Sequence, residues 1–216
     1  MFEKLNTIRI PKYISNRNKV IFSVAVLILG IALGVFSKFL DETASNLLPI
    51  FIEQLDFGNF FSRMGIWIFI ATCISFYSKN PTRAGLNVLL FFIGMVSSYY
   101  LYTVFISEFF PKSYMMIWIL ITVLSPFLGV ICWYAKGTHT VSVVISSFIF
   151  AVMAMTAFNL GINFSYFDVS YFLELILFLA TVLVLYNNPK QILKVIGFGS
   201  VLFILLSLTP IRYFIF

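Results

Sequence analysis

Seven long apolar stretches dominate this sequence, and the short segments between them carry nearly all of its charged residues. A helix needs roughly 20 apolar residues to cross a hydrocarbon core of about 30 Å, and in lipid every backbone hydrogen bond must be made within the protein. Apolar residues make up 61% of the 216 residues and charged residues 10%, whereas a soluble domain has about 45–50% and about 25%. The sequence therefore predicts an all-α fold, a polytopic transmembrane helix bundle. Its seven predicted spans are residues 20–40, 64–78, 84–106, 114–135, 141–160, 169–186 and 192–208.

The segments around the spans complete the predicted domain organisation. We expect a basic cytoplasmic N-terminal segment at 1–19, a single transmembrane helical domain at 20–208 and a short C-terminal tail at 209–216. Within the domain, 41–62 is an outer connector in which an apolar run is interrupted by acids. Such a segment lies in the membrane interface or turns back as a re-entrant piece. A lid over a pocket and a simple connector both fit this pattern.

The distribution of Lys and Arg orients the bundle, because basic residues close to the spans are retained on the cytoplasmic side. With the N-terminus inside and the C-terminus outside, ten of the fourteen basic residues lie inside and nearly all acids lie outside. The net charge of +6 then reflects topology and contact with anionic lipid headgroups, and it calls for no nucleic-acid partner. The predicted inner basic residues are Lys4, Arg9, Lys12, Arg17, Lys19, Lys79, Arg83, Lys136, Lys190 and Lys194. The predicted outer charged residues are Lys38, Arg63, Lys112, Arg212, Asp41, Glu42, Glu53, Asp56, Glu108 and Asp168.

Glu174 is the acidic residue that lies well inside a predicted span. It follows the start of the sixth span by five residues, which is about 8 Å at helical rise. Carboxylates in hydrocarbon are costly and usually face a bundle interior or a water-filled cavity. Contact with a ligand or ion is one interpretation, and a structural ion pair with Lys38 or Arg63 at the same outer level is the other.

Polar aromatic residues gather near the predicted depth of Glu174. Trp67 lies near the outer end of the second span, and Tyr99, Tyr100 and Tyr102 lie near that of the third. Apolar walls with a few hydrogen-bonding groups are typical of small-molecule sites, so these residues and Glu174 are the candidate ligand-binding set. An aromatic belt at the membrane interface explains the same four residues.

Small residues mark faces on which helices can approach closely. The first span contains Gly30-x-x-x-Gly34, and the seventh contains Gly197 and Ser200. We expect packing within the chain to use them. Docking of a second membrane protein on the first span through Gly30 and Gly34 is the alternative.

Catalytic and metal-binding patterns are missing from the sequence. Cys73 and Cys132 both fall within predicted spans and show no Cys/His spacing of a metal site. There is no His-Glu-x-x-His and no pair of intramembrane aspartates. We therefore predict no catalytic residues, no metal, no cofactor and a protein that is not an enzyme.

Two Asn-Pro pairs suggest an internal duplication. Asn80-Pro81 and Asn188-Pro189 each join an outward-to-inward helix to an inward-to-outward one. Three helices, one linker helix and three further helices would form a parallel repeat, as in some small transporters. The alternative is that the two pairs are independent turns, because Asn-Pro is a common turn starter and the flanking spans do not align convincingly.

Several local motifs carry a resemblance to known proteins. Gly65-Ile66-Trp67 before the first Asn-Pro pair, Arg83-Ala84 after it and Gly94-x-x-x-x-Tyr99-Tyr100-Leu101 resemble a family of uncharacterised small bacterial polytopic membrane proteins. That resemblance spans most of the chain, implies the bacterial cytoplasmic membrane and assigns no activity. More remotely, the chain length and the small residues of the first span look like the substrate-binding subunits of energy-coupling-factor transporters. Those usually have six spans, and no ligand-binding motif of theirs can be matched here.

The predicted function is binding or transport of a small solute through an outward-facing pocket. The alternative is a non-catalytic accessory or structural subunit of a membrane complex. The expected partners are membrane lipids, a small-molecule ligand and, for the alternative, a second membrane protein.

Overall fold

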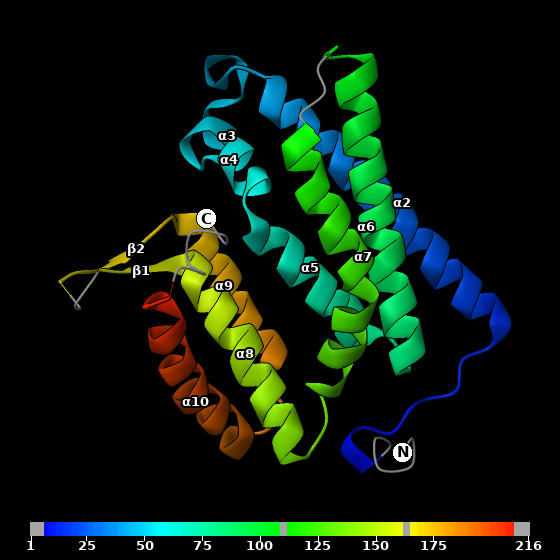
Figure 1. Cartoon of the computed structure of the whole chain (residues 1–216), viewed down its shortest axis with the longest axis vertical. Coiled ribbons are helices and arrows are strands. Elements are labelled where there is room, and N and C mark those ends of the chain that lie inside the picture. The colour runs from blue at the N-terminus through cyan, green and yellow to red at the C-terminus, as the bar shows by residue number, and fades with distance from the viewer. Residues whose placement is uncertain (1–6, 109–111, 162–164, 210–216) are drawn as a thin grey trace. The chain divides into compact units, whose positions relative to one another are not determined.

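The computed structural model describes residues 7–108, 112–161 and 165–209 (Figure 1). The first six residues of the predicted N-terminal segment, including Lys4, and the predicted tail from residue 210 onward, including Arg212, lie outside the described residues. The helices and strands are α2 (Asn16–Glu42), η1 (Ser45–Leu47), α3 (Ile50–Gln54), α4 (Phe57–Ser62), α5 (Met64–Tyr77), α6 (Pro81–Phe105), α7 (Lys112–Tyr134), α8 (Thr140–Ala157), β1 (Phe158–Leu160), β2 (Phe167–Val169), α9 (Phe172–Leu185) and α10 (Pro189–Ser207).

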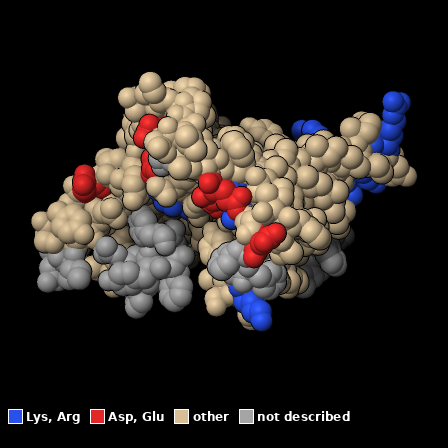
Figure 2. Space-filling model, turned by 90° about the horizontal axis from the view of Figure 1, so that it is seen from above, with Lys and Arg blue, Asp and Glu red and all other residues tan. Residues whose placement is uncertain are grey.

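The predicted all-α class is confirmed for the described part of the chain, which adds only one short hairpin. Five helices, α2, α6, α7, α8 and α10, are long and apolar enough to cross a membrane, while α5 and α9 are shorter apolar helices. With 14 residues each, the two shorter helices extend about 21 Å. Figure 2 shows charged side chains as scattered spots on a surface made mostly of other residues. The chain is thus compatible with a membrane-embedded helical protein.

The hairpin is the clearest departure from the predicted elements. The fifth predicted span reached residue 160 and the sixth began at 169, but α8 ends at Ala157 and α9 begins at Phe172. Between them β1 and β2 pair antiparallel, with Phe158 opposite Val169 and Leu160 opposite Phe167. Aromatic and β-branched residues favour strands, and hydropathy alone cannot separate a short apolar strand from the end of an apolar helix.

The outer connector predicted at 41–62 is built of the short helices η1, α3 and α4. Leu47, Ile50 and Phe51 are large apolar side chains that are exposed. The backbone turns sharply before α4, where Asp56 takes a left-handed conformation with φ 55°. Short helices with exposed apolar side chains fit a segment that lies in an interface.

The chain divides into two compact units. The α2/α6 unit comprises Pro11–Glu53 and Ala71–Trp133, and the α8/α10 unit comprises Met1–Ile10, Gln54–Ile70 and Tyr134–Phe216. The unit boundaries fall between residues 10 and 11, within α3, within α5 and at the end of α7.

In the α2/α6 unit, α2 and α6 pack side by side and run parallel. Near their first turns, Arg83 Nη2 donates to the carbonyl oxygen of Lys19 over 2.7 Å. Near their last turns, the Tyr99 hydroxyl donates to Asp41 Oδ2 over 2.5 Å. The start of α2 contacts the start of α6 and the end of α2 contacts the last part of α6, so the two helices run parallel.

The helix α7 packs on α6 at Gly85. A Cβ added at Gly85 would fall 2.7 Å from the carbonyl oxygen of Pro126. Pro126 lies inside α7 and has no N–H for the Thr122 carbonyl. The Ser125 hydroxyl donates to that carbonyl oxygen over 2.8 Å, which satisfies the acceptor that the proline frees.

In the α8/α10 unit, α8 and α10 also run parallel, with α9 packed on α8 (Figure 1). The Ser147 hydroxyl donates to the carbonyl oxygen of Val195 over 3.4 Å. One turn further along, a Cβ at Gly199 would overlap the ring of Phe150. The glycine of α10 that packs against α8 is therefore Gly199, whereas Gly197 has no heavy atom within 4 Å of the Cβ position.

The segments α5–α6 and α9–α10 follow the same local plan. Both α5 and α9 have 14 residues and carry the pattern Phe-x-Ala-Thr-x-x-x-x-Tyr, at 69–77 and 178–186. Each is followed by an Asn-Pro pair that starts the next helix. The Asn80 side chain accepts from the Arg83 N–H over 2.8 Å, and the Asn188 side chain accepts from the Gln191 N–H over 2.9 Å. In each case the asparagine caps the helix and the proline occupies its first turn.

Candidate functional site: a buried ion pair and an aromatic cavity

Glu174 lies in the first turn of α9 and is 1% exposed. Its Oε1 accepts a hydrogen bond from Nε of Arg63, which ends α4. Arg63 was one of the two partners expected for an ion pair. The other, Lys38, instead pairs with Glu42 on its own helix, with 3.1 Å between Nζ and Oε1.

Local packing brings Arg63 to Glu174. Gly65 follows Arg63 by two residues at the start of α5 and faces both α8 and α9. A Cβ at Gly65 would lie 3.4 Å from Leu177 Cδ2 and from Thr156 Oγ1. The start of α5 therefore packs within contact distance of both helices, which places the arginine at the first turn of α9.

Two further groups surround the Arg63 guanidinium. Asp56 Oδ2 lies 3.3 Å from one terminal nitrogen. The guanidinium carbon lies 3.9 Å from the centroid of the Tyr171 ring, which is a cation–π contact. One positive charge is thus shared by two carboxylates and an aromatic face.

The ion pair leaves polar atoms without partners. Arg63 Nη2 and Glu174 Oε2 are both buried and make no hydrogen bond to the described residues. A buried donor or acceptor without a partner costs roughly 1–3 kcal/mol, and more when it is charged. A ligand with a donor and an acceptor would relieve that cost. Ionisable residues inside membrane segments are functional candidates for this reason.

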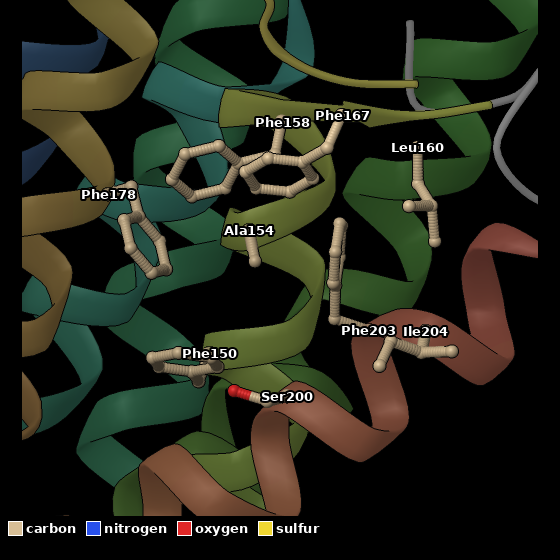
Figure 3. Close-up of a pocket in the computed structure, with 9 residues that line it drawn as sticks. All are labelled: Phe150, Ala154, Phe158, Leu160, Phe167, Phe178, Ser200, Phe203 and Ile204. Carbon is tan, nitrogen blue, oxygen red and sulfur yellow. The ribbon is translucent and has the colours of Figure 1, made fainter. Parts of the chain in front are cut away.

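A cavity of about 380 Å³ lies beside α8, α9, α10 and the hairpin. Five of its lining residues are phenylalanines, and the Ser200 hydroxyl is its one polar side chain among the described residues (Figure 3). Ligand sites commonly have volumes of about 300–1,000 Å³ and such apolar walls. The lining residues are Phe150, Ala154, Phe158, Leu160, Phe167, Phe178, Ser200, Phe203 and Ile204.

The phenylalanines form a connected aromatic wall. The rings of Phe158 and Phe167, one from each strand, stack with centroids 5.2 Å apart. Phe158 also meets Phe178 of α9 edge-on at 5.2 Å, and Phe178 meets Phe150 of α8 at 5.1 Å. The hairpin therefore closes one side of the cavity (Figure 3).

Glu174 and Phe178 place the ion pair and the cavity on one helix face. Both side chains belong to the buried face of α9, and residues four apart are stacked about 6 Å along the axis. The arrangement offers an apolar space with a buried carboxylate one turn away.

The remaining predicted ligand-binding residues divide between the two units. Trp67 lies in the same unit as Glu174. It is 2% exposed and donates its indole N–H to the Phe61 carbonyl oxygen over 2.8 Å. Its one hydrogen-bonding group is therefore used within the fold. Trp67 does not line the described aromatic cavity.

The three tyrosines belong to the α2/α6 unit, near the end of α6. Tyr99 bonds to Asp41, and Lys38 Nζ lies 5.5 Å from its ring centroid. The hydroxyl of buried Tyr100 has no hydrogen-bond partner among the described residues, and Tyr102 is half-buried. Tyr99 thus links the ends of α2 and α6, while the Tyr100 hydroxyl is left with bonding capacity.

Gly30 and Gly34 are used for packing inside this chain. A Cβ at Gly30 would overlap the carbonyl oxygen of Phe91, and one at Gly34 would overlap that of Met95. Both neighbours belong to α6. The glycine face that was the alternative docking site for a partner is thus occupied by α6.

The loop between α7 and α8 carries a perturbed lysine. Lys136 donates to the carbonyl oxygen of Tyr186 over 2.9 Å and to Asn187 Oδ1 over 3.3 Å. Burial lowers the pKa of the Lys136 ammonium group, and the positive charge of Arg9 lowers it further. Burial also lowers the pKa of Arg9.

Sequence reasoning did not identify the residues of the aromatic cavity. Its five phenylalanines come from five different elements, and a phenylalanine facing a cavity has the same hydropathy as one facing lipid. The pattern Phe-x-Ala-Thr occurs at 69–72 and again at 178–181. This recurrence could have drawn attention to Phe178.

The described residues contain no group of three or more His, Cys, Asp or Glu side chains placed to hold a metal ion. Comparison with protein-family models, curated proteins and solved structures gives no match to this chain.

Proposed function

We propose that this protein is a multi-pass protein of the bacterial cytoplasmic membrane that binds a small solute and transports it. The observation that carries the proposal is the repeated plan of α5–α6 and α9–α10, with its recurring Phe-x-Ala-Thr-x-x-x-x-Tyr pattern and Asn-Pro cap. Many transporters are built from two such repeats, and parallel repeats are one of their two forms. The helix α7 is the linker in this arrangement.

The parallel helix pairs support seven crossings. Because α2 and α6 run in the same direction, the chain between them must cross back, and α5 is the apolar helix available. The same argument applies to α9 between α8 and α10. With the basic ends inside, the N-terminus is cytoplasmic and the C-terminus is outside.

The ion pair and the aromatic cavity are the proposed solute contacts. The cavity volume of about 380 Å³ suits a small organic molecule with a substantial apolar part. Glu174 Oε2 and Arg63 Nη2 are the polar atoms without partners, so a hydrogen-bonding or charged substituent on the solute fits beside them. An accessory-subunit role would have to use a face of α2 other than Gly30 and Gly34, because α6 covers those glycines.

Native mass spectrometry of the detergent-purified protein tests the proposal. We expect a retained small molecule on the wild type, less of it on Glu174→Gln and Phe178→Ala, and unchanged amounts on Glu53→Gln, which alters an exposed carboxylate of α3. Each variant is compared at equal folded fraction, judged by its melting profile.

The transport step needs a separate measurement. Proteoliposomes containing the wild type should accumulate the isotope-labelled form of the retained molecule, and Glu174→Gln proteoliposomes should accumulate less. A stoichiometric partner protein with no retained molecule would instead establish the accessory role. Retention without uptake would limit the function to binding.

A further inference from the structure

A second cavity, of about 470 Å³, lies within the α2/α6 unit at the start of α2 and α6. Three of its lining side chains, Lys19, Lys79 and Arg83, are cationic, and no carboxylate lines it among the described residues. Its other lining residues include apolar side chains, among them Phe22 and Ala25 of α2. One cavity therefore combines three cations with apolar side chains.

The Arg83 guanidinium is held in place by the fold. Its Nη2 donates to the Lys19 carbonyl oxygen over 2.7 Å, to the Ser23 hydroxyl and to Asn87 Oδ1 over 3.4 Å. All of these contacts are made by one nitrogen. Within the described residues, Nε and Nη1 of Arg83 are left with donor capacity.

Asn87 is the buried centre of this arrangement, with 1% exposure in the second turn of an apolar helix. Its Oδ1 accepts from Ser23 over 2.7 Å, and its Nδ2 donates to the Ser78 hydroxyl over 3.1 Å. The amide thus joins α2, the turn before α6 and Arg83. This network holds the Arg83 guanidinium in place at the cavity before any ligand arrives.

We propose that this cavity binds the phosphate-bearing headgroup of an anionic membrane lipid. Three cations without an opposing acid attract a phosphate, and an arginine with free donors can bind two of its oxygens. The start of α6 adds the positive end of a helix dipole. The apolar side chains continue along α2, where Ile21 is exposed, so an acyl chain can follow the helix surface.

The apolar side chains of the cavity distinguish a lipid from free phosphate. Inorganic phosphate would use only the cations, whereas a phospholipid uses the cations and the apolar side chains. Basic pockets between helices on the cytoplasmic side are suited to anionic headgroups, and this end of α2 is the basic one. The site is separate from the aromatic cavity and from the ion pair of Glu174, and it does not depend on transport.

Native mass spectrometry of delipidated protein in detergent tests this site. The protein is titrated with phosphatidylglycerol, with zwitterionic phosphatidylcholine and with inorganic phosphate. We expect phosphatidylglycerol to bind more tightly than phosphatidylcholine and inorganic phosphate to compete only weakly. Lys79→Gln should weaken phosphatidylglycerol binding about five-fold, the effect of about one basic residue near an anionic lipid surface.

Lys190→Gln is the matched control, because Lys190 is exposed and directly follows the second Asn-Pro pair. It should leave phosphatidylglycerol binding unchanged. Equal effects of Lys79→Gln and Lys190→Gln, or equal binding of the two lipids, would overturn the site. Tight binding of inorganic phosphate that displaces phosphatidylglycerol would overturn the lipid as its occupant.

Lys79 is chosen because its side chain makes no hydrogen bond to the described residues, so its replacement should leave the fold intact. Unchanged melting temperatures for Lys79→Gln and Lys190→Gln in lipid-free detergent would establish this. If Lys79→Gln melts lower, Lys19→Gln takes its place with the same expected loss of phosphatidylglycerol binding. Normal binding by both lysine variants would also overturn the site.

Discussion

Gly30 of α2 lies directly against the backbone of α6 at Phe91, so that a Cβ on residue 30 would overlap the Phe91 carbonyl oxygen. Backbone on both sides leaves no flexible side chain to move aside. We expect Gly30→Ala to lower the free energy of unfolding by about 1–3 kcal/mol, the usual cost of overpacking. Thermal unfolding in detergent measures it.

Gly197→Ala is the control for this prediction. It also lies within a helix but has open space at the Cβ position. Replacing it should be neutral or should stabilise by up to about 1 kcal/mol, since alanine is the better helix former. Equal effects of the two substitutions would show that α2 and α6 do not pack through Gly30.

These two glycines show what the sequence could and could not predict. The apolar stretches predicted the helices, because lipid leaves a spanning chain little other choice. Spacing of small residues also pointed to Gly30 as a packing residue, and Gly30 lies against the backbone of α6. In α10, however, the sequence pointed to Gly197, whereas the close approach is at Gly199. Which face of an apolar helix meets its neighbour depends on rotation, and hydropathy that is uniform around a helix does not determine it.

The candidate site shows the same division. Charge is so scarce that Glu174 had only two partners to choose from at its level, and Arg63 was one of them. The cavity beside it was not predicted, because its wall depends on the strands β1 and β2, whose apolar sequences look like the ends of the neighbouring helices. Phe158 and Phe167 are nine residues apart and stack only because β1 and β2 pair.

Removing the charge of Glu174 should destabilise the protein strongly. Glu174→Gln leaves Arg63 with only the more exposed Asp56 as a counter-charge. Breaking one side of a buried pair costs about 3–5 kcal/mol. Chemical unfolding of the purified variant measures the loss.

Glu42→Gln is the comparison, because it breaks a pair with Lys38 four residues away on one helix. Such pairs contribute less than about 1 kcal/mol. The double variant Arg63→Leu/Glu174→Leu should regain part of the stability, since no charge is then left buried. A loss as small for Glu174→Gln as for Glu42→Gln would contradict the buried pair.

The Asn87 network should be sensitive to loss of its amide. Asn87→Leu leaves the Ser23 hydroxyl, the Ser78 hydroxyl and one bond of Arg83 without this partner. A hydrogen bond contributes about 0.5–1.5 kcal/mol, and more when one partner is charged, so we expect the loss of these three bonds to cost at least about 2 kcal/mol. Asn16→Leu makes the same substitution at an exposed asparagine and should change stability little. Comparable melting temperatures for the two variants would remove Asn87 from the network.

Lys136 predicts a pH dependence of stability. Its pKa in the folded protein is lowered from the ordinary 10.5 by burial and by Arg9, so the folded state binds fewer protons than the unfolded state in the window just below 10.5. Stability therefore rises with pH in that window. Lys136→Gln keeps a donor for the Tyr186 carbonyl oxygen but loses this dependence.

The measurement compares melting temperatures of the wild type and Lys136→Gln at several pH values between about 8 and 10.5. The advantage of Lys136→Gln over the wild type should shrink as the pH rises. Lys190→Gln, which removes an exposed lysine, supplies the baseline for general charge effects. A constant difference across the window would mean that the charged form of Lys136 does not destabilise the folded protein.

The parallel directions of α2 and α6 make a sharp prediction about α5. If both long helices cross the membrane from the same side, the end of α2 and the start of α6 must lie on opposite faces, and the chain between them must cross once. A membrane-impermeant maleimide should therefore label Ala44→Cys in intact cells but label Thr82→Cys only after permeabilisation. Both positions are exposed, and Cys73 and Cys132 are replaced by alanine in the background.

The same reasoning applies to α9, so Asp168→Cys should be labelled from outside and Lys190→Cys only after permeabilisation. Labelling of Ala44→Cys and Thr82→Cys from the same side would mean that the 14-residue α5 does not cross, and the parallel packing of two spanning helices would then be impossible.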